Sequence, residues 1–378
     1  MSSLVPRDRY AALGRCTYLN QAALGLIPVP TVEAMHTFVD QVAQFGNLYL
    51  SDEQEAAILD GVRSAGAALL GTTPRAVAVV GSASEGLGQV ASLLAPDRGN
   101  VVLVASDFPS VTYPWLAAAE RRRISLRFVE DRPDRNLGHD LVSAIEPTTV
   151  VVAFSVVQYA TGTRVDAREV AERAHEVGAR VIVDATQLAG AGPVDMVGWG
   201  ADALVTSGYK WLSAHGGVAL LALAPDLVGG LPGLVGWKGT HEPFAFDAQT
   251  LRLADDARRF ELSTMSYTSA TGLESSIAML SSIGIGRIDR HARRLAARLI
   301  DRAGELAWRP FRALGDASAA SHIVSLRHAH RDPGVVAERL ASDHGIICGG
   351  RAGGLRISLH AYNDDEDVDR LVEALRHL

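Results

Sequence analysis

Two charged residues, a lysine and an aspartate that each follow a short apolar run, are the best candidates for chemistry. Lys210 lies in Ser207-Gly208-Tyr209-Lys210-Trp211, just after an apolar run. Burial beside small and aromatic residues disfavours the ammonium form, and a neutral amine is the nucleophile that forms imines. Asp184 ends another apolar run, where a poorly solvated carboxylate needs a cation such as a protonated pyridine nitrogen. A surface lysine and a helix-capping aspartate are the plainer alternatives.

Three further segments follow apolar runs in the same way. Gly81–Gly86, with its small residues and serines, suits a phosphate at a helix start, or is an ordinary serine cap. Phe108 is placed to stack on a flat heteroaromatic ligand, or fills a gap in the core. Gln158 and Tyr159 offer polar groups at the same level, or form a polar turn.

The elements that position these residues alternate between short β-branched runs and segments with helical spacing such as Arg168–Val177. That alternation predicts βαβ units and a mostly parallel sheet with helices on both faces. In such sheets ligands bind beyond the carboxyl ends of the strands, which is where the candidate residues lie. The expected strands are Ala76–Val80, Val101–Ala105, Ser125–Val129, Thr149–Phe154, Arg180–Val183, Ala203–Thr206 and Val218–Leu223.

The pattern changes after a loop rich in glycine and proline, Gly229–Thr240. Beyond it helices dominate, with short strands between them, which predicts a smaller α+β domain. We therefore expect an N-terminal arm at residues 1–30 that lies across both domains, a large domain at 31–240 and a small domain at 241–378. The expected C-terminal helices are Gly272–Ser282, Arg287–Leu306, Pro333–His344 and Asp364–Leu378, and the expected strands lie near His322–Leu326, Ile346–Cys348 and Leu355–Leu359.

The composition is that of an ordinary globular protein. Of the 378 residues 48% are hydrophobic and 21% charged, and the net charge of −7 gives no electrostatic reason to expect nucleic acid or an anionic membrane as partner. Two cysteines do not make a disulfide framework, so we expect a cytoplasmic protein. No signal peptide or membrane span is expected.

The motifs VDATQ and SGYKW, preceded by GSASEG and SDFPS, resemble the class V aminotransferase family of fold-type I enzymes that use pyridoxal 5′-phosphate (PLP). That family includes cysteine desulfurases, kynureninases and isopenicillin-N-epimerase-like proteins. The resemblance extends from Tyr18-Leu19-Asn20 to Leu359–Leu378. It implies an α/β fold with a large domain, built on a seven-stranded, mostly parallel sheet sandwiched by helices, and a smaller α+β C-terminal domain.

The resemblance also implies roles for residues around the cofactor ring. Lys210 matches the lysine that forms the Schiff base with PLP and moves protons, and Asp184 matches the partner of the pyridine nitrogen. Gln187 matches the residue near the phenolic oxygen. Phe108 falls at the stacking position, and Tyr209 precedes the lysine, both as in kynureninases.

The phosphate and the substrate carboxylate have matching residues as well. Ser84 with the amide of Ala83, and Ser207, match phosphate ligands, and Tyr159 is a further cofactor contact. Thr264 resembles the threonine that reaches the cofactor of a neighbouring subunit, which implies a homodimer with a shared active site. The closing motif LRISLHAYNDDEDVDRLV places an arginine at the position that grips the substrate α-carboxylate. The expected substrate-binding residues are Arg356 and Asn20, and no metal is expected.

The reaction is less determined than the cofactor. Cys348 lies eight residues before Arg356 in an expected strand, without the usual loop, which disfavours a cysteine desulfurase that works by persulfide transfer. Transamination, for which Lys210 suffices as proton shuttle, is the leading expectation. Lyase-type cleavage is an alternative, and so is epimerisation, which needs a second acid or base such as Tyr159 or His215. A PLP-fold binding protein without turnover is the remaining alternative.

Overall fold

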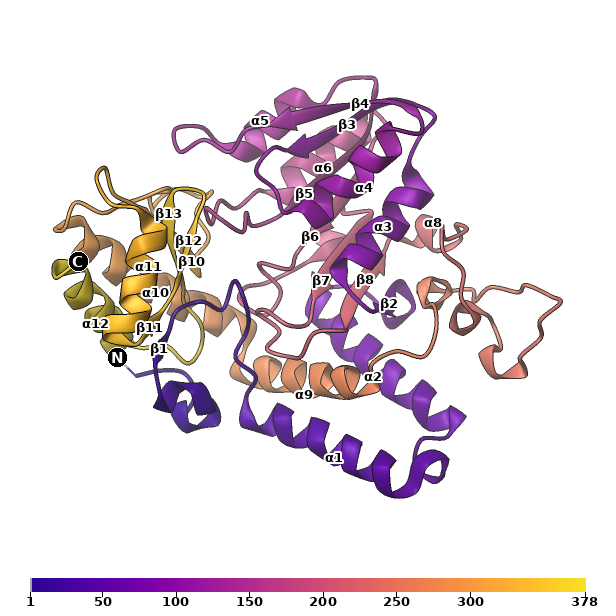
Figure 1. Cartoon of the computed structure of the whole chain (residues 1–378). Helices are drawn as coiled ribbons and strands as arrows, with labels where there is room; N and C mark the ends of the chain where they lie inside the picture. Colours follow the sequence, from indigo (N-terminus) through magenta and orange to yellow (C-terminus); the bar gives the residue numbers. More distant parts are fainter. Residues whose placement is uncertain (1) are drawn as a thin grey trace.

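A seven-stranded sheet forms the centre of the computed structural model, which describes residues 2–378 (Figure 1). The strand order is β2-β8-β7-β6-β5-β3-β4, and β8 alone runs antiparallel to its neighbours. The strands are β2 (Val77–Val80), β3 (Arg98–Val104), β4 (Arg123–Val129), β5 (Thr149–Ser155), β6 (Arg180–Asp184), β7 (Ala203–Ser207) and β8 (Ala219–Leu223). The expected α/β fold with a mostly parallel sheet is confirmed.

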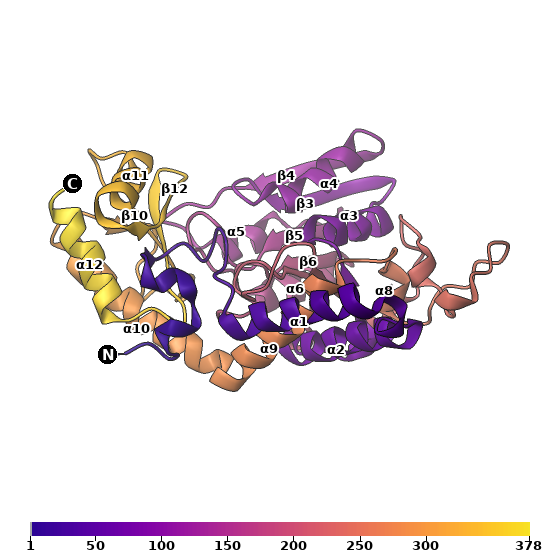
Figure 2. The same cartoon turned by 60° about the horizontal axis from the view of Figure 1, so that its bottom comes forward.

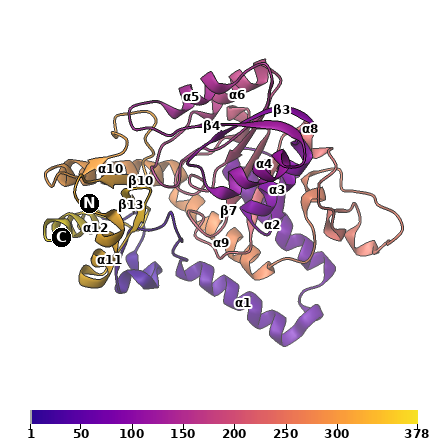
Figure 3. The same ribbon diagram turned by 45° about the horizontal axis from the view of Figure 1, so that its top comes forward.

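Helices cover both faces of this sheet, which explains why β5, β6 and β7 are buried along almost their whole length. One face packs against α2 (Asp52–Leu70), α5 (Leu137–Ala144), α6 (Ala167–Glu176) and α9 (Tyr267–Ile283). The other packs against α3 (Ala83–Leu94) and α4 (Pro109–Ala119). Figures 2 and 3 show these two helical layers from different sides.

A second, smaller core lies in the C-terminal part, where a four-stranded antiparallel sheet of order β12-β13-β10-β9 packs against three helices. Both chain termini lie beside it in Figure 1. Its elements are α10 (Ile285–Gly304), β9 (Arg309–Pro310), β10 (Ile323–Arg327), α11 (Pro333–His344), β12 (Gly349–Arg351), β13 (Gly354–Ser358) and α12 (Asp365–Arg376). The expected α+β character agrees with this arrangement.

The N-terminal segment bridges the two cores. Its strand β1 (Thr17–Tyr18) pairs in parallel with β11 (Ile346–Ile347) of the small domain. The Gly25 N–H then donates to the Tyr209 carbonyl of the large domain at 2.9 Å. A side chain at Gly25 would collide with the Lys210 carbonyl, since an added Cβ would lie 2.0 Å from that oxygen. This close approach brings the arm against the lysine loop.

The long helix α9 belongs with the large sheet, although it falls within the expected small domain of residues 241–378. It packs along α1 (Val29–Phe45) and α2, and its apolar residues join the core of the large domain. Gly284, at φ +93°, separates α9 from α10. We therefore propose a division near Gly284 rather than at residue 240, because burial of an apolar helix face decides which core a helix joins.

A segment at residues 229–256 projects from the side of the large domain that lies away from the small one (Figures 1 and 2). It carries the short helices η5 (Trp237–Gly239) and η6 (Pro243–Ala245) and has little regular structure. Several large apolar side chains are exposed on it, namely Leu231, Leu234, Val235, Phe246 and Leu251. Exposed apolar residues gathered on one segment are typical of an interaction surface.

A buried ion pair joins the two domains. Arg312, two residues after β9, donates to Asp131 beyond β4 at 2.9 Å, and both side chains are almost wholly buried. Arg312 also donates to the Thr163 hydroxyl and to two backbone carbonyls of the large domain. These contacts hold the small-domain sheet against the loops that follow β4 and β5.

Candidate active site

A cavity of about 130 Å³ lies at the carboxyl edge of the large sheet, where the sequence predicts a ligand site. It is bounded by residues that follow β2, β3, β5, β6 and β7. The sequence-predicted residues around it are Ala83, Ser84, Phe108, Tyr159, Asp184, Gln187, Ser207, Tyr209 and Lys210, and it is also lined by Ser82, Ser110, Ser155 and Thr186. Side chains far apart in the sequence thus surround one space.

Lys210 lies in this cavity with its amine close to two aromatic rings. Its Nζ is 5.2 Å from the centre of the Phe108 ring and 5.6 Å from that of Tyr209. Burial lowers the pKa of Lys210 to about 8, although the carboxylate of Asp184 opposes this shift. A substantial share of neutral amine near neutral pH makes Lys210 a competent nucleophile.

Asp184 ends β6 and faces Lys210 from the neighbouring strand. Its carboxylate accepts the Thr186 N–H at 2.8 Å and is otherwise enclosed, with 5% of the residue exposed. Burial raises the pKa of this carboxyl, while the bonds to Thr186 and the charge of Lys210 lower it. A carboxylate in such surroundings gains from a cationic partner within the cavity.

A second buried carboxylate, Asp107, lies near Asp184 and was missed by sequence reasoning. It accepts hydrogen bonds from the Ser155 hydroxyl at 2.6 Å, the Ser155 N–H at 2.7 Å, the Phe108 N–H at 2.7 Å and the Gln158 amide at 3.3 Å. Burial raises the pKa of Asp107 to about 6, opposed by Ser155 and assisted by the charge of Asp184. Asp107 therefore ties the Phe108 backbone to the loop that carries Tyr159.

One end of the cavity is rich in hydrogen-bond donors. Ala83 and Ser84 form the first turn of α3, where backbone N–H groups have no partner within the helix. The Ser84 hydroxyl lies 2.7 Å from that of Ser110, which belongs to the first turn of α4. Two helix starts and two hydroxyls at one point suit a phosphate group. Ser110 was another residue that sequence reasoning missed.

Ser207 and Gln187 are buried, in contrast to the exposed Ser84. The Ser207 N–H donates to the Thr186 hydroxyl at 3.1 Å. Gln187 accepts from the Trp211 indole at 2.7 Å and donates to the Ala22 carbonyl at 3.1 Å, so both ends of its side chain already have protein partners. Its amide retains one hydrogen for a ligand.

Arg356, on β13 of the small domain, lies just beyond the residues that line the cavity. It donates to the Tyr159 carbonyl at 2.9 Å and to the Asn20 side chain at 3.2 Å, and only 2% of the residue is exposed. Its Nε has no partner and no carboxylate pairs with it among residues 2–378. Burial, with help from Arg351, lowers the pKa of Arg356 to about 10. Its charge also acts on Lys210, which places the two cations in one electrostatic environment.

Three other residues weighed from the sequence lie elsewhere. Thr264 is exposed and does not line this cavity. His215 is also exposed, with its ring next to the Gly216 carbonyl. Burial raises the pKa of the Cys348 thiol to about 12, which disfavours a thiolate there.

No cluster of metal-binding side chains occurs within the described residues, and none of their helices is long and apolar enough to span a membrane.

The sequence model of the family described as Aminotransferase class-V matches residues 17–371 of this chain. Among curated relatives, a "Probable cysteine desulfurase" of Methanothermobacter thermautotrophicus is 28% identical and aligns over 96% of this chain and 94% of its own length. An "Uncharacterized aminotransferase YcbU" of Bacillus subtilis is 26% identical over 98% and 96%. A "Kynureninase" of Bacillus cereus is 26% identical over 96% and 88%.

Solved structures with the same fold include an apo cysteine desulfurase from Thermococcus onnurineus. It has a TM-score of 0.87 and 26% identity, and the alignment covers the whole of both chains. A lysine-to-alanine mutant of C-DES, with glycine covalently linked to its PLP cofactor, has a TM-score of 0.90 at 21% identity and covers 98% of this chain and 99% of its own. The second likeness shows the fold alone.

Proposed function

Since this chain belongs to the aminotransferase class-V family of PLP enzymes, we propose that it acts on an α-amino acid and that its reaction is transamination. One observation carries the choice of substrate class. A lysine with a lowered pKa and a buried arginine that lacks a carboxylate partner act on the same space. An α-amino acid offers the two groups that these side chains recognise, an amine and a carboxylate.

The donor set of the cavity fits PLP. Two helix starts with the hydroxyls of Ser84 and Ser110 suit its phosphate, and the Phe108 ring suits its flat heterocycle. Asp184 is the buried carboxylate that a protonated pyridine nitrogen needs. When bound, the cofactor supplies an electron sink for negative charge that develops at the substrate α-carbon.

The chain's own residues would then act as follows. Lys210 Nζ would hold the cofactor covalently and, once released, would carry the proton that leaves the substrate α-carbon. Asp184 would hold the proton on the ring nitrogen. Arg356 would bind the substrate carboxylate with two parallel N–H donors of its guanidinium group. The Asn20 side chain and the Tyr159 carbonyl hold that group in place.

Transamination is favoured over persulfide transfer because Cys348 is half-buried and desolvation raises the pKa of its thiol. Epimerisation would need a second acid or base on the face opposite Lys210. His215 does not line the cavity, which leaves Tyr159 alone for that role. Lyase-type cleavage is the second candidate. Tyr159 and Tyr209 both border the cavity, and a tyrosine there could protonate a leaving group. Curated relatives also carry the names cysteine desulfurase and kynureninase.

We also propose that the working form is a homodimer that shares its active sites. Ser84, at the phosphate end of the cavity, is exposed in the single chain, next to Tyr113, whose side chain is 63% exposed. The segment at 229–256 presents further exposed apolar residues, and Thr264 follows it in sequence. A second copy that covers these surfaces would close the phosphate end and bring its own Thr264 to it.

A panel of amino acids added to the cofactor-loaded protein without a keto acid tests the reaction. Transamination converts the cofactor to pyridoxamine phosphate and releases one keto acid per site. Release of ammonia together with pyruvate would instead establish elimination, and solvent deuterium at an inverted α-carbon would establish epimerisation. If the protein incubated with PLP never develops a visible absorbance band that borohydride removes, the assignment of Lys210 fails.

A further inference from the structure

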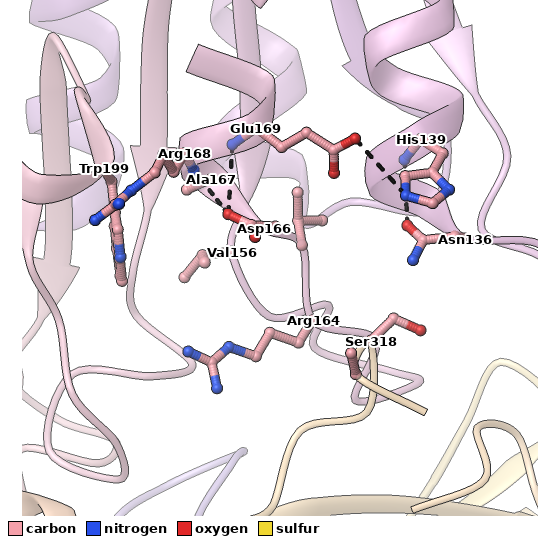
Figure 4. A pocket seen from close by; sticks show the side chains of 12 residues that line it. Asn136, His139, Val156, Arg164, Asp166, Ala167, Arg168, Glu169, Trp199 and Ser318 are labelled. Carbon is pink, nitrogen blue, oxygen red and sulfur yellow. Dashed lines mark hydrogen bonds and ion pairs between the residues drawn. The ribbon is translucent and has the colours of Figure 1, made fainter. Parts of the chain in front are cut away.

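A cavity of about 500 Å³, larger than the one around Lys210, lies on the side of the sheet covered by α5 and α6 (Figure 4). It is enclosed by the first turns of these two helices, the loop after β5, α7 (Met196–Trp199) and residues 317–318 of the C-terminal part. Its volume is in the range of small-molecule sites, roughly 300–1,000 Å³. Neither the proposed reaction nor the family motifs use its polar residues.

Two arginines in this cavity have no anionic partner. The guanidinium groups of Arg164 and Arg168 make no hydrogen bond or ion pair with any residue of the described part of the chain. Neighbouring arginines behave differently, since Arg135 pairs with Asp140 and Arg173 with Glu176. Both arginines border the hollow without an ion pair, Arg164 half-buried and Arg168 exposed.

The carboxylates of the cavity are engaged elsewhere. Asp166 caps α6 by accepting the N–H groups of Arg168 and Glu169 at 3.1 and 3.4 Å. Glu169 lies 3.7 Å from the imidazole of His139. In Figure 4 Glu169 and His139 lie on one side of the cavity, and the two guanidinium groups lie on the other with Trp199.

The walls of the cavity offer a flat apolar surface and further donors. Trp199, the last residue of α7, is half-buried and borders the cavity with its indole. The side-chain oxygen of Asn136 caps α5 by accepting a hydrogen bond from the His139 N–H at 3.2 Å. The two hydrogens of the Asn136 side-chain amide remain free. Guanidinium groups and an indole that border one cavity are suited to an anion that is attached to a flat ring.

We propose that this cavity binds a phosphate ester of a flat-ring compound, of the size of a nucleoside monophosphate. The phosphate would lie between Arg164 and Arg168, and the ring would lie against Trp199. Each guanidinium group can donate a pair of hydrogen bonds to the oxygens of a phosphate monoester. The site does not depend on the chemistry at Lys210, so its failure would leave the proposed function untouched.

Calorimetric titration of the cofactor-loaded protein tests this proposal with three probes: adenosine 5′-monophosphate, inorganic phosphate and adenosine. We expect the monophosphate to bind with one site per chain and to leave the absorbance of the bound cofactor unchanged. Phosphate without the ring, and adenosine without the phosphate, should each bind more weakly. If neither the monophosphate nor phosphate binds at millimolar concentration, the proposal is overturned.

Variants locate the site. Arg164→Gln and Arg168→Gln should each weaken binding of the monophosphate by about tenfold or more, because each removes a charge-assisted pair of hydrogen bonds. Arg121→Gln, an exposed arginine outside the cavity, is the matched control and should bind as the unchanged protein does. Equal binding by all three variants would overturn the proposal.

The ring contact is tested separately with Trp199→Leu. This change should bring the affinity for the monophosphate down to that for inorganic phosphate while leaving the affinity for phosphate unchanged. If the monophosphate binds no more tightly than phosphate before the change, the part of the proposal that concerns the ring is wrong. Circular dichroism of each variant, matched to the unchanged protein, confirms that the fold is retained.

Discussion

Arg312 and Arg356 are both buried arginines of the small domain that reach toward the large one, but they face different surroundings. Arg312 meets the buried carboxylate of Asp131 at 2.9 Å and fills its remaining donors with backbone carbonyls and a threonine hydroxyl. Arg356 meets only a carbonyl and an amide oxygen, and its Nε is unpartnered. A charge kept out of water without an opposite charge is costly, so the second arrangement indicates a place reserved for an anion.

The largest effect is expected on stability at the paired arginine. Arg312→Leu leaves Asp131 as an uncompensated buried charge, and should lower the free energy of unfolding by about 3–5 kcal/mol. Urea unfolding followed by circular dichroism measures this. The double variant Arg312→Leu with Asp131→Leu should recover most of the loss, because it removes both charges. A double variant no more stable than the single one would show that the backbone contacts of Arg312 matter more than its ion pair.

At Arg356 we expect the reverse, a large loss of activity with little loss of stability. Arg356→Leu removes the anion receptor and should lower kcat/KM for the amino acid by about 100-fold, equivalent to roughly 3 kcal/mol, with little loss of stability. Arg356→Lys should not restore the rate, since an ammonium lacks the planar fork. Activity is measured once the substrate panel has identified a turnover. Retention of full activity in Arg356→Leu would contradict the proposed carboxylate contact.

Two histidines at the same domain junction differ from both arginines, because they are buried in their neutral form. Burial lowers the pKa of both His322 and His360 to about 4, and both rings pack against Trp211. Since the unfolded chain takes up protons below about pH 6.5 while the folded one does not, stability should fall as the pH drops from about 6.5 to about 4, by roughly 2–3 kcal/mol for each histidine.

Unfolding midpoints compared at about pH 7 and about pH 5 measure this slope. His360→Phe keeps an aromatic ring at the position and should flatten the dependence on pH, whereas His36→Phe, at an exposed histidine, should not. The same slope in both variants would mean that other groups cause the acid sensitivity. Asp184 and Asp107 could not be those groups, because a raised pKa in the folded state makes stability rise as the pH falls.

The contrast between the two arginines also shows how far the sequence could lead. Asp184 and Lys210 were predictable because Asp184 ends one buried strand and Lys210 comes three residues after the end of the next, Ser207. Parallel strands bring their carboxyl ends to one edge of the sheet. Arg356 was placed by its motif, but its lack of a carboxylate partner depends on tertiary packing. The pairing of Arg312 with Asp131 joins residues 181 positions apart, and no local pattern signals it.

Other features escaped sequence reasoning for related reasons. The strand β12 is only three residues long and two of them are glycines, so it lacks a strand-like pattern. The helix α9 was expected, but its place beside α1 and α2 depends on which core its apolar face meets. Asp107 lies next to Phe108, the only residue of this segment for which the sequence predicted a role. Its network with Ser155 and Gln158 becomes visible only when neighbouring strands lie side by side.

Asp107 is the buried carboxylate for which we expect the smallest effect, because its partners are neutral. In Asp107→Asn the new side-chain NH2 group would point at the N–H of Ser155 or at that of Phe108. Two hydrogen-bond donors would then face each other where a donor now faces an acceptor. Stability should fall by about 1–2 kcal/mol and cofactor affinity by about tenfold, since the Phe108 backbone and the loop of Tyr159 lose their common anchor. Titration with PLP followed by absorbance measures the affinity, and the exposed Asp134→Asn is the control. A variant that binds PLP as tightly as the unchanged protein would show that Phe108 is held in place by packing alone.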